Sequence, residues 1–130
     1  MEGATVLVTG AGIGLGAATA VALGEAGYRV IVTDILNEEG EGVAAHIRAQ
    51  GGAATFMFLD VTDTAAVSAL IATVEAQYGA IYGLVLNAGI ARTLPLSTLT
   101  DDEWDETINV NLKGMVRVLR AAAPSMRAAH

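Results

Sequence analysis

Glycines are concentrated in one short segment near the start of the chain, where residues 10–16 read Gly-Ala-Gly-Ile-Gly-Leu-Gly. A β-branched apolar run, Thr5 to Thr9, comes before this segment, and an alanine-rich stretch follows it. Glycines let backbone N–H groups approach a phosphate, and the N-terminus of a following helix adds free N–H groups and the positive end of its dipole. The segment therefore predicts a pyrophosphate-binding turn between a strand and a helix. A tight turn without a ligand is the alternative interpretation.

Three polar residues, Asp34, Asp60 and Asn87, each follow one of the later apolar runs of the chain. The carboxyl ends of parallel strands meet at one edge of a sheet, where ligands bind, so we expect these side chains to lie near the glycine turn. A carboxylate at Asp34 can accept hydrogen bonds from both ribose hydroxyls of NAD and would repel the 2′-phosphate of NADP. We therefore predict that NAD is preferred over NADP. The alternative is that Asp34 only caps a helix.

Short apolar runs alternate with helical patterns along the whole chain, and this alternation predicts right-handed crossovers and a parallel sheet. The expected fold class is α/β, a Rossmann-type doubly wound parallel sheet that is incomplete, with about four strands and four helices. The predicted strands are Thr5–Thr9, Arg29–Thr33, Ala54–Leu59 and Ile81–Leu86, and the predicted helices end near Ala26, Gln50, Tyr78 and Ala122.

Size and composition favour one soluble domain over residues 1–130. The formal net charge of −7 makes a nucleic-acid surface improbable, because phosphate neutralisation needs clustered Lys and Arg. The chain has no cysteine and only two histidines, so we predict no metal site. The uncharged stretch from Gly3 to Gly24 is too rich in glycine for a membrane span, and Met1-Glu2 lacks the basic start of a signal peptide. We expect a cytoplasmic protein.

The last helix, predicted at residues 102–122, begins with a capping box formed by Thr100 and Glu103. Asn111 falls within its apolar stripe, and a buried amide without partners costs about 1–3 kcal/mol. Asn111 is therefore either an active-site residue or a structural amide that bonds neighbouring backbone, and the two roles are compatible. Asn109 points about 200° away on an α-helix and is predicted to lie on the surface. The stripe consists of Trp104, Ile108, Met115 and Val118.

Several segments, in order along the chain, resemble the signatures of one enzyme family. Residues 9–16 resemble a TGxxxGxG motif, Asp60-Val61 resembles an adenine-contacting pair, and residues 109–114 resemble a helix segment that carries an active-site asparagine. Residues 87–89 resemble the end of an NNAG motif, in which Leu86 replaces the first asparagine. On these motifs the chain is similar to classical short-chain dehydrogenases/reductases over nearly its whole length. The resemblance implies an NAD(P)-dependent oxidoreductase that acts on alcohols or ketones.

The resemblance also implies roles for individual residues. It makes Asn111 the catalytic residue of this segment, because the family's asparagine helps to hold a proton-relay water near a catalytic lysine. The residues that it implies for cofactor binding are Gly10, Gly12, Ile13, Gly14, Leu15, Gly16, Asp34, Ile35, Asp60, Val61, Asn87, Ala88, Gly89 and Val110.

The catalytic Tyr-x-x-x-Lys pair of that family is absent from this sequence. The tyrosines Tyr28, Tyr78 and Tyr82 are followed four residues later by Val32, Tyr82 and Leu86. We therefore interpret the chain as the cofactor-binding half of an enzyme, truncated before this pair, and expect it to be inactive alone. The implied partners are NAD(H) and, in a full-length relative, a small alcohol or ketone that the sequence does not identify.

Two other hypotheses fit the same sequence. A non-catalytic dinucleotide-binding module or sensor would have the glycine turn and would also lack the Tyr-x-x-x-Lys pair. A self-associating structural half-domain would use the last helix, which has more apolar surface than one half-sheet can cover. Under every hypothesis we expect a homo-oligomer through helix 102–122. The apolar residues of that helix are Trp104, Ile108, Leu112, Met115, Val116 and Leu119.

Overall fold

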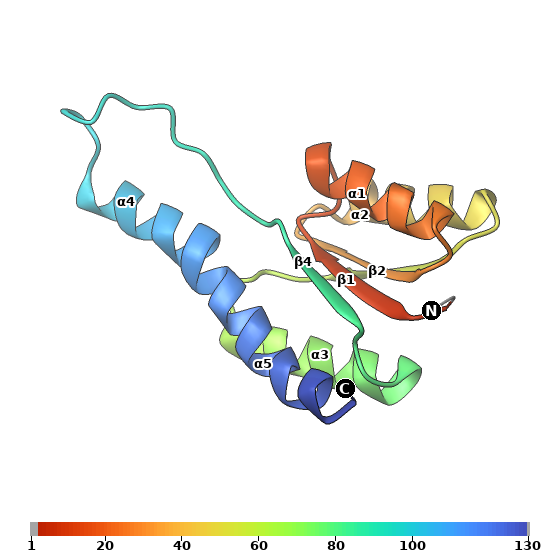
Figure 1. Cartoon of the computed structure of the whole chain (residues 1–130). Coiled ribbons are helices and arrows are strands. Elements are labelled where there is room, and N and C mark those ends of the chain that lie inside the picture. The colour runs from red at the N-terminus through yellow and green to blue at the C-terminus, as the bar shows by residue number, and fades with distance from the viewer. Residues whose placement is uncertain (1–2, 130) are drawn as a thin grey trace.

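The structure, a computed structural model, describes residues 3–129 of the chain. Four parallel strands form one sheet in the order β3-β2-β1-β4, and helices connect successive strands (Figure 1). The predicted fold class is confirmed. The elements are β1 Thr5–Thr9, α1 Gly14–Glu25, β2 Arg29–Asp34, α2 Asn37–Ala49, β3 Ala53–Phe58, α3 Thr64–Tyr78, β4 Gly83–Leu86, α4 Asp101–Ile108, the π-helical turn η1 Asn109–Lys113 and α5 Gly114–Ala129.

Each face of the sheet has its own apolar core. Alternate residues of a strand point to opposite faces, so Leu7 of β1 packs with α3 and α5 while Val6 and Val8 pack with α1 and α2. Figure 1 shows the two helical layers on either side of the strands. Because both faces are covered, the central strands β1 and β2 are almost fully buried. The carboxyl ends of the strands are thereby held together at one edge of the sheet.

The fourth strand is shorter than predicted and begins at Gly83 rather than Ile81. Ile81 is fully buried in the core that contains α3 and α5. The backbone N–H of Tyr82 donates to the carbonyl of Thr5 over 2.8 Å. The apolar pattern before Gly83 therefore reflects core packing of Ile81, and the segment stays attached to β1 by one backbone hydrogen bond.

The last helix differs most from its prediction. It runs from Asp101 to Ala129 and contains the turn η1 in its middle. Trp104, which the sequence placed in the apolar stripe of this helix and also among its apolar surface residues, is 55% exposed, and no residue of α4 is buried. The reason is that α4 extends away from the sheet (Figure 1), so that only α5, through residues such as Val118, packs on α3. Met115, which was predicted for the same stripe, is also exposed. Among residues 3–129, no helix combines the length and the apolar character needed to cross a membrane.

Two glycines of α2 provide a test of the packing of this helix on the sheet. A Cβ at Gly40 would lie 2.2 Å from Cε2 of Phe56, whereas a Cβ at Gly42 would have no heavy atom within 4 Å. We predict that Gly40→Ala lowers the free energy of unfolding by about 1–3 kcal/mol, because the Phe56 ring must move within the core. Gly42→Ala should raise it by about 0.5–1 kcal/mol, since alanine loses less backbone entropy on folding. Chemical denaturation measures both changes, and equal effects of the two substitutions would contradict the described packing.

Candidate functional site

The glycine turn fits closely against the ends of two strands and the first turn of α1. Gly10 has φ +64°, in the left-handed region that favours glycine, and a Cβ on it would lie 2.8 Å from the Cα of Ala88. A Cβ at Gly16 would lie 2.1 Å from the carbonyl oxygen of Gly10 and 2.5 Å from Nδ2 of Asn87. Neither position has room for a side chain. The turn therefore needs glycine for steric reasons.

The N-terminus of α1 has no side-chain cap. Its N-cap residue is Ile13, whereas α3 is capped by Asp63 and α4 by Thr100. The first N–H groups of a helix have no partner within the helix, and without a cap they are available to an anion. Ile13 and Leu15 are 60% and 81% exposed at this end of the helix. This end of α1 can accept a phosphate without displacing a protein side chain.

Asp34 connects the end of β2 to the glycine turn. It is 8% exposed, its Oδ2 accepts a hydrogen bond from the N–H of Gly12 over 2.8 Å, and its Oδ1 accepts one from the N–H of Leu36 over 3.1 Å. Asp34 is not the N-cap of α2, because that residue is Leu36. Asp34 contacts the start of this helix through the hydrogen bond from the N–H of Leu36. The carboxylate thus holds the turn and also lines the adjoining pocket.

Thr9 is the central residue of the junction between β1 and β4, and it was not among the predicted site residues. Its buried Oγ1 accepts hydrogen bonds from the N–H of Asn87 over 3.0 Å and of Ala88 over 3.1 Å. The Nδ2 of Asn87 in turn donates to the carbonyls of Thr9 and Gly10, over 3.1 Å and 2.9 Å. The sequence signal was available, since Thr9 begins the glycine motif. It was overlooked because the motif was interpreted through its glycines.

The loop after β3 is ordered by Asp60. Its Oδ1 accepts hydrogen bonds from the N–H and the hydroxyl of Thr62, over 2.9 Å and 2.7 Å. Val61 is buried, and a Cβ at Gly114 would lie 2.6 Å from its Cγ2. The start of α5 therefore packs directly against this loop.

Asn111 makes a paired contact with the backbone of Ile90. The N–H of Ile90 donates to Oδ1 over 2.7 Å, and Nδ2 donates to the carbonyl of Ile90 over 2.8 Å. Asn111 is therefore a structural amide whose oxygen and nitrogen both bond to neighbouring backbone, as one of the two interpretations predicted. Gly89 lies beside it, since a Cβ there would be 3.3 Å from Oδ1 of Asn111. Asn111 fixes the loop after β4 against the last helix.

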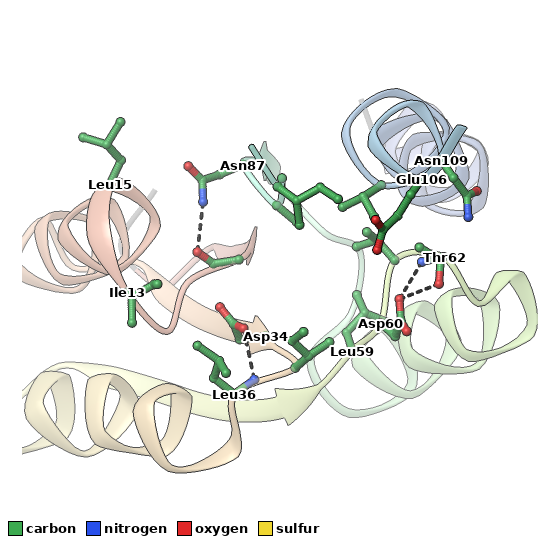
Figure 2. A pocket seen from close by; sticks show the side chains of 17 residues that line it. Ile13, Leu15, Asp34, Leu36, Leu59, Asp60, Thr62, Asn87, Glu106 and Asn109 are labelled. Carbon is green, nitrogen blue, oxygen red and sulfur yellow. Dashed lines mark hydrogen bonds between the residues drawn. The ribbon is translucent and has the colours of Figure 1, made fainter. Parts of the chain in front are cut away.

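A pocket of about 720 Å³ opens at the carboxyl ends of the strands. In Figure 2, Asp34, Asp60 and Asn87 lie around it, with Ile13 and Leu15 on the side of α1 and Glu106 and Asn109 on the opposite side. The predicted residues that line it are Gly10, Ile13, Leu15, Asp34, Ile35, Asp60, Val61, Asn87, Ala88, Gly89 and Val110.

The remaining predicted residues do not line the pocket, and Gly14 is exposed. Gly12 contacts Asp34, Gly16 packs against Gly10, Asn111 holds Ile90, and Gly14 lies between Ile13 and Leu15. The lining also includes residues that were not predicted for the site: Leu36, Leu59, Thr62, Ile90, Glu106 and Asn109.

The prediction that Asn109 lies on the surface is wrong. Asn109 is half-buried and lines the pocket. Its Oδ1 accepts a hydrogen bond from Nη2 of Arg117 over 2.6 Å. Residues 109–113 form a π-helical turn, and Asn109 at its start is covered because Arg117 donates to both its side chain and its carbonyl. The sequence pattern gave no sign of this turn.

The pocket wall carries acidic side chains, one of which has a cationic partner. Glu106 forms an ion pair with Arg92, and the hydrogen bond and charge of Glu106 raise the pKa of Arg92 above its usual value. Beside this pair, hydrogen bonds from the backbone and the side chain of Thr100 lower the pKa of Glu103, as expected for the confirmed capping box. Among the described residues, no group of three His, Cys, Asp or Glu side chains is placed to hold a metal ion.

The sequence matches the family described as short chain dehydrogenase over residues 4–130. The short-chain reductase protein NovJ of Streptomyces niveus is 43% identical over 121 residues, which cover 93% of this chain and 46% of NovJ. The chain spans about half the length of the curated relatives that it matches.

Solved structures share the fold closely. A metagenomic short-chain oxidoreductase in complex with NADP superposes with a TM-score of 0.94 at 41% identity, over 99% of this chain and 59% of that protein. A gluconate 5-dehydrogenase from Burkholderia cenocepacia, in complex with NADP and tartrate, gives a TM-score of 0.91 at 39% identity. That match covers 99% of this chain and 51% of the dehydrogenase.

The junction between β1 and β4 can be tested at Thr9. We predict that Thr9→Val, which keeps the shape but leaves the N–H groups of Asn87 and Ala88 without their acceptor, lowers the free energy of unfolding by about 1–3 kcal/mol. Thr9→Ser retains the hydroxyl and is the matched control, expected to cost less than the valine substitution. Chemical denaturation measures both changes, and a loss in Thr9→Ser with none in Thr9→Val would show that the methyl group, and not the hydroxyl, holds the junction.

Proposed function

This chain belongs to the short-chain dehydrogenase/reductase family, and from that premise we propose that it supplies the NAD(H)-binding half of an oxidoreductase. The observation that carries the proposal is the convergence of four strand ends on one pocket of about 720 Å³ beside an uncapped helix N-terminus. The glycine turn has no room for a side chain at Gly10 or Gly16, so its backbone is open to a pyrophosphate. The backbone N–H groups at the start of α1 would bind the phosphates. When bound, NAD accepts a hydride at its nicotinamide ring.

Asp34 supports the choice of NAD over NADP. Its carboxylate lines the pocket, where it would accept hydrogen bonds from ribose hydroxyls and repel a 2′-phosphate. The first arginine after it in the chain, Arg48, is paired with Glu41 and donates to the carbonyl of Ala54. The glycine turn offers the apolar Ile13 at the pocket instead of a cation. The two solved relatives described above are complexes with NADP, so the preference for NAD rests on these side chains alone.

The reaction of the whole enzyme would be hydride transfer between NAD(H) and a small alcohol or ketone. In that reaction the alcohol carbon would give up a hydride to the cofactor, and the hydroxyl proton would pass to a base. The residues of this chain would bind and orient the cofactor, while Asn111 would hold the loop after β4 beside the reacting groups. No tyrosine of the chain is followed by a lysine four positions later, so the acid/base pair would come from outside residues 1–130. On its own the chain should show no dehydrogenase turnover, as a non-catalytic module also would not.

Self-association through the last helix is part of the proposal. The side chains of Leu112, Val116 and Leu119 recur at helical spacing and are 55%, 50% and 49% exposed. A contiguous apolar strip of this kind on a protein surface favours contact with another chain. A second copy is the proposed partner, with the same strip on both copies.

Cofactor choice can be tested by titrating the chain with NADH and with NADPH while following cofactor fluorescence. We predict saturable binding of NADH and at least about tenfold weaker binding of NADPH. Asp34→Asn should reduce the ratio of the two dissociation constants, because it removes the charge that repels the 2′-phosphate. Asp63→Asn removes one charge outside the pocket and keeps an N-cap on α3, so it should leave the ratio unchanged. Equal affinity of the unsubstituted chain for both cofactors would contradict the assignment to Asp34.

The oligomer is tested by size-exclusion chromatography with light scattering. The unsubstituted chain should elute as a dimer or larger species, and Val116→Glu should shift it to the monomer, because a charge in the apolar strip would be buried without a partner. Ala72→Glu on the exposed face of α3 is the matched control and should leave the mass unchanged. A monomer at every concentration of the unsubstituted chain would overturn the proposed interface.

A further inference from the structure

Arg117 of α5 joins two segments that are far apart in the sequence. Its Nη1 donates to the carbonyls of Asn109 and Val61, over 3.0 Å and 3.2 Å, and its Nη2 donates to Oδ1 of Asn109 over 2.6 Å. Its Nε donates to the hydroxyl of Thr64 over 3.2 Å. The planar guanidinium therefore bridges the turn η1 to the loop after β3 and the first residue of α3.

The turn η1 is one turn of π-helix between two α-helices, and Arg117 binds its first residue. In this turn the N–H of Gly114 donates to the carbonyl of Asn109, an i→i+5 bond in place of the regular i→i+4 bond. The carbonyl of Asn109 receives a second, charge-assisted hydrogen bond from Arg117. The Asn109 side chain is held by the same guanidinium. Arg117 thus stabilises the wide turn and fixes the direction of the Asn109 side chain.

Both segments that Arg117 joins form walls of the pocket. Val61 and Thr62 line it from the loop after β3, and Asn109 and Val110 line it from η1. The two walls touch where the start of α5 packs on Val61, because Gly114 has no side chain there. This side of the pocket is therefore held by the close packing of Gly114 on the Val61 side chain and by the guanidinium of Arg117.

We infer that Arg117 is a positioning residue of the nucleotide pocket. It does not line the pocket itself and acts through the residues that do. It holds η1 and the loop after β3 as one rigid wall opposite the glycine turn. The inference rests on the proposed function for its ligand, while the rigid wall itself can be tested without any ligand. Loss of the guanidinium should change the shape of this one wall and leave the rest of the fold little affected.

The substitutions are Arg117→Met, which keeps an unbranched apolar side chain, and Arg117→Lys, which keeps the charge. Lysine offers a single donor group and cannot span the acceptors on three residues, so we expect it to restore little. Arg120→Met is the matched control, because Arg120 is exposed three residues further along the same helix. Each variant is assayed for NADH affinity, for global unfolding by denaturant, and for amide hydrogen exchange by peptide.

Arg117→Met is expected to weaken NADH binding at least about tenfold, because the cofactor would then have to order a wall that Arg117 otherwise holds in place. Amide exchange should rise in residues 61–66 and 109–114, with no change in β1 or α1. Arg117→Lys should resemble the methionine variant, and Arg120→Met should match the unsubstituted chain.

Two results would overturn the inference. One is unchanged NADH affinity and unchanged local exchange in Arg117→Met. The other is exchange that rises evenly over the whole chain, because this would make Arg117 a general contributor to stability. If the unsubstituted chain binds no NADH, the proposed function fails for this chain, and the exchange pattern alone then decides whether Arg117 holds the wall.

Discussion

The site depends on one close contact, the approach of the first turn of α1 to the carbonyl of Gly10. No side chain fits at Gly16, where a Cβ would lie 2.1 Å from that oxygen. The contact brings the uncapped helix end directly over the ends of β1 and β4, and the buried hydroxyl of Thr9 holds β4 in place through two backbone N–H groups. A larger residue would separate α1 from the strands and widen the turn. The position of the helix N-terminus, where a phosphate would bind, is therefore determined by how closely α1 packs on the ends of β1 and β4.

The rest of the pocket is built around this contact by polar side chains that bind backbone. Asp34 holds Gly12, Asp60 holds Thr62, and Asn111 holds Ile90. Each loop that follows a strand is thus fixed by a carboxylate or an amide that binds its backbone. Such loops are pre-organised, and pre-organisation reduces the entropy that a ligand must otherwise overcome when it binds.

The sequence predicted the sheet and most of the pocket because both depend on local patterns. β-branched runs, glycine turns and polar residues at strand ends repeat with the alternation of strands and helices, and the topology then brings the strand ends together. Asn109 and Glu106 could not be predicted as pocket residues, because their positions depend on the contact of Asn109 with Arg117 and on the path of α4 beyond the sheet. The apolar stripe that includes Trp104 likewise does not reveal where its helix leaves the core. Arg117 could not be predicted in this role, because two of its four acceptors, on Val61 and Thr64, lie more than fifty residues away in the sequence.

The central claim is that a dinucleotide binds across the carboxyl ends of all four strands, with its phosphates at the N-terminus of α1. The most direct test is a heteronuclear NMR titration of the chain with NADH that follows each backbone amide. The account predicts the largest shifts at residues 12–16, with further shifts at 34–36, 60–62, 87–90 and 109–110, and little change at the amino-terminal ends of the strands. Shifts confined to another surface, or saturable binding that leaves residues 12–16 unchanged, would contradict it.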